Sequence, residues 1–362
     1  MPLRHPSQKF VVAVIYVCGM VMSSLDSTIV NVALATLSRE FKVPPTKIEA
    51  VVIGYLVSLA VFIPASGWMG DRWGTKRTFL FALGLFTTAS ALCGLAQSLD
   101  QLVAFRVLQG AGGGLLTPVG LAMLYRAFPP KERVAMSRIL MFALIVGPAA
   151  GPVLGGLLIQ QRSWRWAFYV NVPVGLLALL FGVVFLHEHK EPATGAFDLP
   201  GFLLAGSGLA LTMYALSEGP SRPFPSAPVV ATGAAGLVLL TVFVAVELRA
   251  PHPMVQLRLL QNMLFRSTLL VSFFATVGFA GILYLVPLFL QEARGASPLA
   301  SGLTTFPEAI GVVVSTQLVA RLYPRVGPRR LIAGGLLGVA VGMVLLSLVD
   351  LETGAWAIGA VM

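Results

Sequence analysis

Long apolar runs, separated by short polar segments, are the feature of this sequence that most limits its fold. Residues 50–66 and 78–96 are runs of this kind, and the second carries no charged side chain. Only 11% of the 362 residues are charged and 57% are apolar, too few polar groups to cover a water-soluble domain. A backbone in hydrocarbon must satisfy its own hydrogen bonds, and the runs lack the period of two of barrel strands. The sequence therefore predicts an all-α polytopic membrane protein.

The apolar runs predict the membrane spans and their grouping. We expect a six-helix amino-terminal bundle over 1–188, two extra transmembrane helices over 189–250, and an incomplete carboxy-terminal bundle over 251–362. The last run, 354–362, is too short to cross a hydrocarbon core of about 30 Å, so either the chain is a fragment or its tail is not a span. The predicted spans lie at about 10–37, 48–70, 77–97, 101–128, 135–159, 166–186, 199–217, 227–248, 267–291, 299–320 and 330–349.

The segment GWMGDRWGTKR, residues 67–77, predicts a tight hairpin between two spans. Gly67 and Gly74 allow the turn, Asp71 and Arg72 can cap helix ends, and Arg77 marks a cytoplasmic face. The segment recurs as ARLYPRVGPRR at 320–330, where aligning Gly74 with Gly327 also aligns basic residues. A loop that recurs in two halves predicts a duplicated bundle, and parallel repeats of this kind are known in secondary transporters.

The net charge of +10 does not indicate nucleic acid, because most of the 25 Lys and Arg residues fall in loops on the side of the amino terminus. This positive-inside pattern predicts a cytoplasmic amino terminus. The first apolar run is too long for a cleaved signal. Cys18 and Cys93 lie inside predicted spans and form no disulfide or metal framework. We expect no cofactor, no metal and no enzymatic activity, because GxxxxGK, HExxH and paired-carboxylate motifs are missing from the sequence.

Three charged residues lie within predicted spans, where charge is costly and marks function by default. Asp26 and Arg106 fall at similar depth, and a low-dielectric site with a cation nearby suits a carboxyl group that gains and loses a proton. Glu308, just after Pro307, could bind a proton or a cationic ligand. Structural alternatives stay open: a permanently paired Asp26, an Arg106 that reaches toward the interface, and a Glu308 that lines a wet cavity.

A stripe of small residues marks the fifth span, in the segment GPAAGPVLGG. Its glycines at intervals of four present a smooth helix face on which another backbone can pack closely, and its prolines add kinks. Close packing alone would explain the glycines, whereas prolines within the same stripe sharpen the signal. The residues of this stripe are Gly147, Pro148, Gly151, Pro152, Gly155 and Gly156.

These motifs together resemble the 14-span drug:proton antiporter family of the major facilitator superfamily. SLDSTIVNVAL (24–34), RVLQGAGGG (106–114), the glycine stripe and the loop 67–77 resemble its motifs, and the likeness covers nearly the whole chain. The resemblance implies proton coupling by Asp26 and Arg106, a stripe that closes during alternating access, and a gate network of Asp71, Arg72 and Arg77. It also implies that 199–248 is the extra helix pair of 14-span members.

The sequence thus predicts a secondary transporter, proton-coupled and exporting small amphipathic compounds or drugs. The alternatives are proton-coupled uptake or export of a metabolite, and a truncated remnant without activity. The expected partners are a small-molecule substrate, protons and the lipid bilayer of a bacterial cytoplasmic membrane, with no nucleic acid. Whether an accessory export protein takes part is left open.

Overall fold

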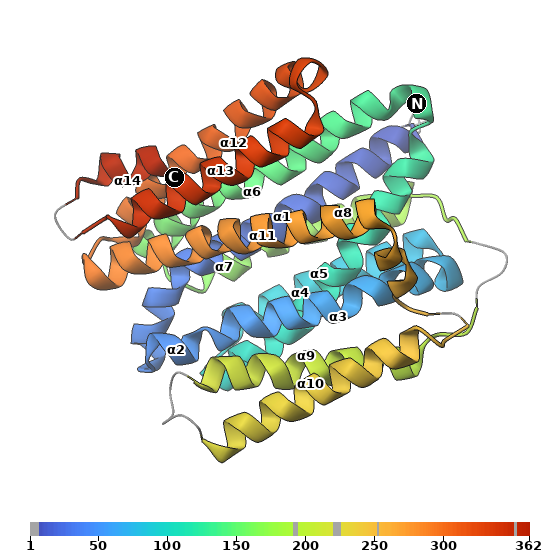
Figure 1. Ribbon diagram of the computed structural model, residues 1–362, viewed down its shortest axis with the longest axis horizontal. Coiled ribbons are helices and arrows are strands. Elements are labelled where there is room, and N and C mark those ends of the chain that lie inside the picture. The colour runs from blue at the N-terminus through green and yellow to red at the C-terminus, as the bar shows by residue number, and fades with distance from the viewer. Residues whose placement is uncertain (1–6, 191–194, 220–225, 252, 351–352) are drawn as a thin grey trace. The chain divides into compact units, whose positions relative to one another are not determined.

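The computed structural model describes residues 7–190, 195–219, 226–251, 253–350 and 353–362, and most of these lie in helices (Figure 1). The α-helices are α1 (Gln8–Phe41), α2 (Pro45–Ile48), α3 (Ala50–Trp73), α4 (Thr75–Leu95), α5 (Leu99–Ala127), α6 (Arg133–Gln161), α7 (Trp166–Tyr169), α8 (Asn171–Phe185), α9 (Leu199–Glu218), α10 (Ala227–Glu247), α11 (Met263–Leu288), α12 (Pro298–Val326), α13 (Pro328–Ser347) and α14 (Ala355–Val361).

The predicted helices are confirmed, with two local differences. The predicted span 166–186 is divided into α7 and α8 at Val170, and α11 ends at Leu288 in a π-helical turn, Phe289–Ala293. Polar side chains fix several helix starts by accepting a backbone N–H two or three residues on. The capping residues of this kind are Ser7, Ser98, Asp198, Asn262 and Ser297.

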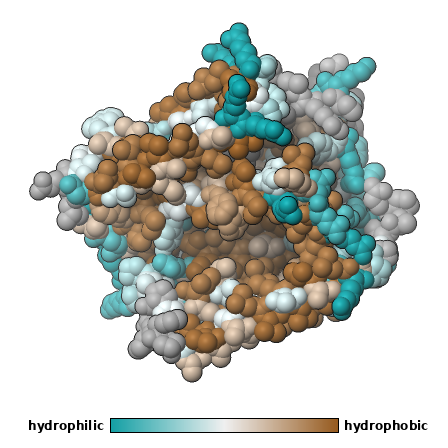
Figure 2. Space-filling view, viewed as in Figure 1, coloured by the Kyte–Doolittle hydropathy of each residue, from teal (hydrophilic) through white to brown (hydrophobic). Residues whose placement is uncertain are grey.

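Within the described residues, nine helical segments are long and apolar enough to cross a membrane, judged by length and composition. The sequence also predicts α6 and α12 as spans, and neither is among the nine. In α12 the apolar run is interrupted by serine, threonine, proline and Glu308. Apolar side chains cover much of the visible face in Figure 2, as expected for helices that contact lipid. Leu177, Leu180 and Leu264 are examples of such exposed side chains.

The chain divides into two units, which do not follow the predicted boundaries at 188 and 250. One unit comprises 1–23, 37–143 and 168–258, and the other 24–36, 144–167 and 259–362. In the first unit α5 packs against both α3 and α4, α4 contacts α8, and α9 lies beside α10 and contacts α3 (Figure 1). The predicted three-part organisation stays a prediction.

Glycines allow the helices of the first unit to approach closely. A Cβ on Gly112 would lie 2.7 Å from the backbone nitrogen of Phe86 in α4, and one on Gly114 would lie 2.5 Å from the carbonyl oxygen of Leu59 in α3. Because lipid tails are as apolar as leucine, van der Waals packing of this kind contributes more to helix association than removal from water. The core of the unit includes Phe79 and Phe86, both fully buried.

The second unit has fewer buried residues of its own. Its apolar cluster contains Val286, Leu290 and Ile358, and α12 contacts α11, α13 and α14. Close backbone approach recurs here, since a Cβ on Gly302 of α12 would overlap the carbonyl oxygen of Pro152 in α6. This contact places the glycine stripe of α6 against α12.

Candidate functional site

Arg106 is buried in the core of the first unit, with only 1% of its surface exposed. Its Nε donates to the carbonyl oxygen of Val51 in α3 at 3.2 Å, and Nη1 donates to Oε1 of Gln109 at 2.8 Å. The guanidinium lies 4.1 Å from the ring centroid of Tyr55, a cation–π contact in a desolvated setting. Arg106 is therefore held inside the helix bundle by α3 and α5, and its role in proton coupling stays a prediction.

Further polar side chains hold this arginine in place. Gln109 lies one turn after Arg106 on α5 and accepts a hydrogen bond from Cys93 Sγ at 3.6 Å. The Tyr55 hydroxyl shares a 3.0 Å hydrogen bond with Ser23 of α1, so Tyr55 joins the arginine to the first helix. Gln109 could have been predicted as a partner of Arg106, because it follows Arg106 by three residues in RVLQG, about one helical turn. Tyr55 and Ser23 lie in apolar runs and carry no signal in the sequence.

Asp26 is completely buried and lies three residues after Ser23 on α1. A carboxyl group inside a membrane helix costs about 2.5 to 3.5 kcal/mol on insertion scales, so a position in the protein interior is expected for it. Asp26 and Arg106 belong to different units, and their pairing stays a prediction.

Glu308 lies on a polar face of α12. Ser301, Thr305 and Glu308 are spaced by four and three residues, and all three are buried, Glu308 with 6% of its surface exposed. No hydrogen-bond partner for Glu308 Oε1 or Ser301 Oγ is found among the residues that the structure describes. Leaving such groups unsatisfied costs about 1 to 3 kcal/mol each, which suits a place where a ligand or proton binds.

The glycine stripe of α6 packs against the second half of α1, within the second unit. A Cβ on Gly147 would overlap Ser24, one on Gly151 would overlap Thr28, and one on Gly155 would lie 3.1 Å from Ile29 Cγ2. Thr28 Oγ1 donates to the carbonyl oxygen of Gly147 at 3.2 Å. The glycines are thus needed for backbone contact with the helix segment that carries Asp26.

Pro152 and Gly156 of the stripe lie on the side of α6 toward α12. A Cβ on Gly156 would lie 2.6 Å from the carbonyl oxygen of Pro298, and the carbonyl of Pro152 abuts Gly302. Pro148 lies in α6, but its side chain falls outside the described part of the structure. The stripe therefore contacts two helices, α1 and α12, whereas a single face of small residues would contact one.

The loop 67–77 is reduced to one residue between helices, because α3 ends at Trp73 and α4 begins at Thr75. Gly74 has φ +99° and ψ 147°. Gly327, its predicted counterpart between α12 and α13, has φ +80° and ψ 160°. These backbone conformations are nearly the same and are open almost only to glycine, which supports the predicted repeat. Gly67 is exposed in α3, and a Cβ at this position would meet nothing within 4 Å.

Charged residues of this loop pair with neighbouring helices. Glu188, three residues after α8, caps α4 by accepting the backbone N–H groups of Lys76 at 2.9 Å and Arg77 at 3.2 Å. Arg77 Nε lies 3.7 Å from Glu188, and Arg126 Nη2 of α5 lies 3.8 Å from Asp71. The sequence did not predict these contacts of Glu188 and Arg126. Arg72 is exposed, and the predicted network among Asp71, Arg72 and Arg77 stays a prediction.

Replacing Gly74 with alanine is expected to lower the thermal unfolding midpoint more than replacing Gly327 does. Both positions have positive φ, which costs about 1 to 3 kcal/mol for a residue with a Cβ. Only at Gly74 would that Cβ also overlap the Glu188 carboxylate, whereas nothing lies within 4 Å at Gly327. Thermal unfolding of the two purified variants in detergent measures the difference. Equal shifts would contradict the role of Glu188 as a cap packed on this turn.

The sequence profile described as Major Facilitator Superfamily matches residues 16–362, nearly the whole chain. The chain belongs to this superfamily. Relatives of known name within it include the multidrug resistance protein B homolog of Mycobacterium tuberculosis H37Rv, 34% identical over 329 residues, covering 90% of this chain and 61% of that protein. The putative multidrug resistance protein MdtD of Salmonella paratyphi A is 36% identical, covering 89% of this chain and 68% of that protein.

The chain spans about three fifths of the length of the first of these curated relatives. Solved structures share its fold at low sequence identity. A peptide transporter POT in complex with sulfate has a TM-score of 0.65 and 15% identity, covering 100% of this chain and 80% of that chain. A POT family transporter in complex with 5-aminolevulinic acid has a TM-score of 0.69 and 14% identity, and the match covers 100% of this chain and 82% of that chain. These likenesses establish the major facilitator fold, and the superfamily consists of transporters.

Proposed function

We propose that this major facilitator protein is a secondary transporter that exports small amphipathic compounds in exchange for protons. The observation that carries the proposal is the burial of Asp26 and Arg106 in two apolar membrane helices. Buried charges in membrane helices are costly and occur where protons, ions or substrates move. The multidrug resistance names of the relatives support a drug-like substrate class.

In the proposed cycle Asp26 alternates between its protonated and its ionised form. Arg106 cannot lose its proton, so it supplies a fixed positive charge in the bundle, oriented by Val51, Gln109 and Tyr55. Protonation of Asp26 would favour one arrangement of the helices, and binding of substrate would favour the other. A proton gradient could then drive export by shifting the balance between the two arrangements. The contact of Gly147 and Gly151 with α1 would be the surface that closes during alternating access.

The proposed membrane topology follows the distribution of basic residues. The amino terminus and the loop 67–77 would be cytoplasmic, in a bacterial cytoplasmic membrane. The division into 1–188, 189–250 and 251–362 is proposed as a bundle, an extra helix pair and part of a second bundle.

Dye accumulation in energised cells tests the proposal. Cells that express the chain are expected to accumulate less ethidium than vector controls, and a protonophore should abolish the difference because export depends on the proton gradient. Higher accumulation would indicate uptake instead. Equal accumulation in expressing and control cells, with the protein present in the membrane, would contradict export.

Replacing Glu308 with glutamine is expected to reduce export of a cationic dye at least fivefold and to spare a neutral amphipathic dye. The substitution keeps the shape of a buried side chain whose Oε1 has no hydrogen-bond partner in the described ranges, and removes its negative charge. Initial export rates of ethidium and of neutral Nile red, measured in the same cells, give the ratio. An equal loss for both dyes would contradict a cation site and indicate a structural or proton-coupling role.

A further inference from the structure

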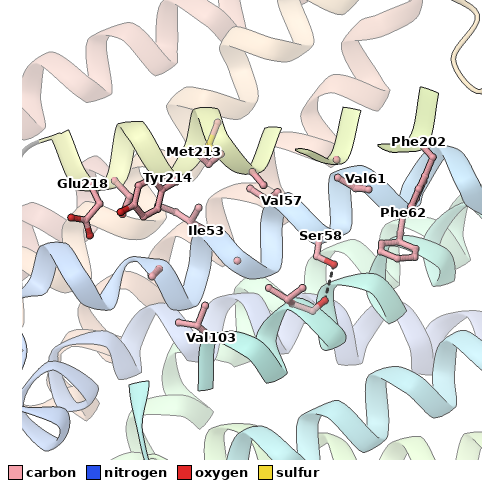
Figure 3. Close-up of a pocket in the computed structure, with 16 residues that line it drawn as sticks. Ile53, Val57, Ser58, Val61, Phe62, Val103, Phe202, Met213, Tyr214 and Glu218 are labelled. Carbon is pink, nitrogen blue, oxygen red and sulfur yellow. Dashed lines mark hydrogen bonds between the residues drawn. The ribbon is translucent and has the colours of Figure 1, made fainter. Parts of the chain in front are cut away.

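An elongated groove of about 500 Å³ lies between α9 and the pair α3 and α5, all in the first unit (Figure 3). This volume is typical of pockets for drug-sized ligands. Small residues create it: Gly206 and Ala210 of α9 line one wall, and Gly54 of α3 lines the other. A Cβ on Gly54 would lie 3.3 Å from Val107, so α3 packs tightly on α5 while the small side chains of α9 leave space.

One end of the groove is closed by aromatic rings. Phe62 of α3 and Phe202 of α9 meet edge to face with centroids 5.3 Å apart, and Figure 3 shows both rings at that end. Phe197 lies between Phe202 and Trp68 in tilted ring contacts, with centroid distances of 5.6 and 5.0 Å. The Trp68 Nε1 donates to the carbonyl oxygen of Gly195 at 2.8 Å. This chain of rings anchors the start of α9 to α3 and fixes the closed end.

The walls are apolar, and the polar groups gather at the opposite end. Tyr214, Ser217 and Glu218 lie on the last turns of α9, and Figure 3 shows Tyr214 and Glu218 together there. Ser58, in the middle of the groove, donates its hydroxyl to the carbonyl oxygen of Val107 at 2.6 Å and so presents little polarity. At 1.5 Å per residue, the distance along α9 from Phe202 to Glu218 is about 24 Å, most of a hydrocarbon core of about 30 Å.

Among the described residues that line the groove, Glu218 is the one that carries a charge. Glu49 directly precedes the first residue of α3 and Asp100 lies in the first turn of α5, so the helices that form the groove each carry an acid at or beside one end. Lys47 is a basic residue of α2, a helix that contacts α9. Such a setting attracts a cation and disfavours the phosphate of a phospholipid headgroup.

We propose that this groove binds an amphipathic organic cation, with its positive group near Glu218 and its apolar body along α3 and α9 toward the Phe62–Phe202 pair. Arg106 and Gln109 are not among the residues that line this site. It goes beyond the proposed proton exchange, because binding here requires neither a proton gradient nor Asp26. In this proposal the extra helix α9 forms one wall of a ligand-binding site.

Photolabelling of the purified full chain in lipid nanodiscs tests the proposal. The probe is dodecyltrimethylammonium with a diazirine at the end of its chain, and mass spectrometry locates the adducts. Adducts are expected on α3 and α9 near Phe62 and Phe202, and unlabelled dodecyltrimethylammonium should compete for them. Adducts confined to other helices would overturn the proposal.

Charge variants separate the cation from a lipid occupant. Glu218→Gln is expected to weaken labelling by the cation at least fivefold, whereas Lys47→Gln, the matched control of opposite charge, should leave it equal or strengthen it. Gly206→Leu fills the groove and should abolish labelling near Phe62. If a diazirine phosphatidylcholine labels the same residues equally well and Glu218→Gln changes nothing, the occupant is lipid and the proposal fails. Export measured separately shows whether the transport function stands without this site.

Discussion

Replacing Asp26 with asparagine is expected to abolish proton-driven export, by at least a hundredfold in initial rate, while the protein stays in the membrane at its normal level. Asparagine has nearly the same size and can form hydrogen bonds, but it cannot exchange a proton. Asp26 is fully buried in α1, so a neutral side chain also removes a cost of about 2.5 to 3.5 kcal/mol for charge in hydrocarbon. Dye export under an imposed pH gradient, with immunoblots of the membrane fraction, measures both quantities.

Two further variants make this prediction specific. Glu40 lies on the same helix and is exposed, so Glu40→Gln is the matched control and should export normally. Asp26→Glu keeps a titratable group and is expected to retain part of the export. If Asp26→Asn exports as fast as the unchanged protein under the same gradient, Asp26 does not couple protons.

Replacing Gly151 with valine is expected to abolish export and to lower the thermal unfolding midpoint strongly. Even one Cβ at this position would overlap the Thr28 side chain of α1, and overpacking costs about 1 to 3 kcal/mol or more. Gly281→Val in α11 is the matched control, because nothing lies within 4 Å of a Cβ there. Thermal unfolding in detergent and dye export in cells measure the two effects.

A double substitution tests whether the contact itself is responsible. Thr28→Ala removes the hydroxyl oxygen, the nearest atom that the Cβ of Gly151→Ala would meet, so the pair of substitutions should cost less than the sum of the two single ones. Additive costs, or equal unfolding midpoints for Gly151→Val and Gly281→Val, would show that α6 does not rely on close packing at this position.

The helices and the repeated turn could be predicted from the sequence because their signals are local. Uncharged runs of about 20 residues have one stable solution in hydrocarbon. Gly74 in GWMGDRWGTKR predicts a tight turn, and Gly74 and its counterpart Gly327 both adopt a positive φ. The close approach of Gly147, Gly151 and Gly155 to another helix was likewise predictable from their spacing, although the identity of that helix was not.

The surroundings of the charged residues could not be predicted, because they depend on contacts between distant segments. Tyr55 lies in an apolar run, and only packing brings its ring to Arg106 and its hydroxyl to Ser23. Glu188 lies in the segment after α8 and caps α4, which lies more than a hundred residues earlier in the chain. The groove behind Phe62 arises from the way α9 stands beside α3, which no local pattern encodes.

Proton movement in liposomes tests the central claim most directly. The purified chain is reconstituted with a pH-sensitive dye inside, and ethidium is added outside without any imposed pH gradient. Exchange predicts that ethidium entry drives protons out, so the internal pH rises, and that liposomes with Asp26→Asn show no such rise. Ethidium entry without a change in internal pH, or an equal rise with Asp26→Asn, would contradict an account in which this buried carboxyl group exchanges protons for substrate.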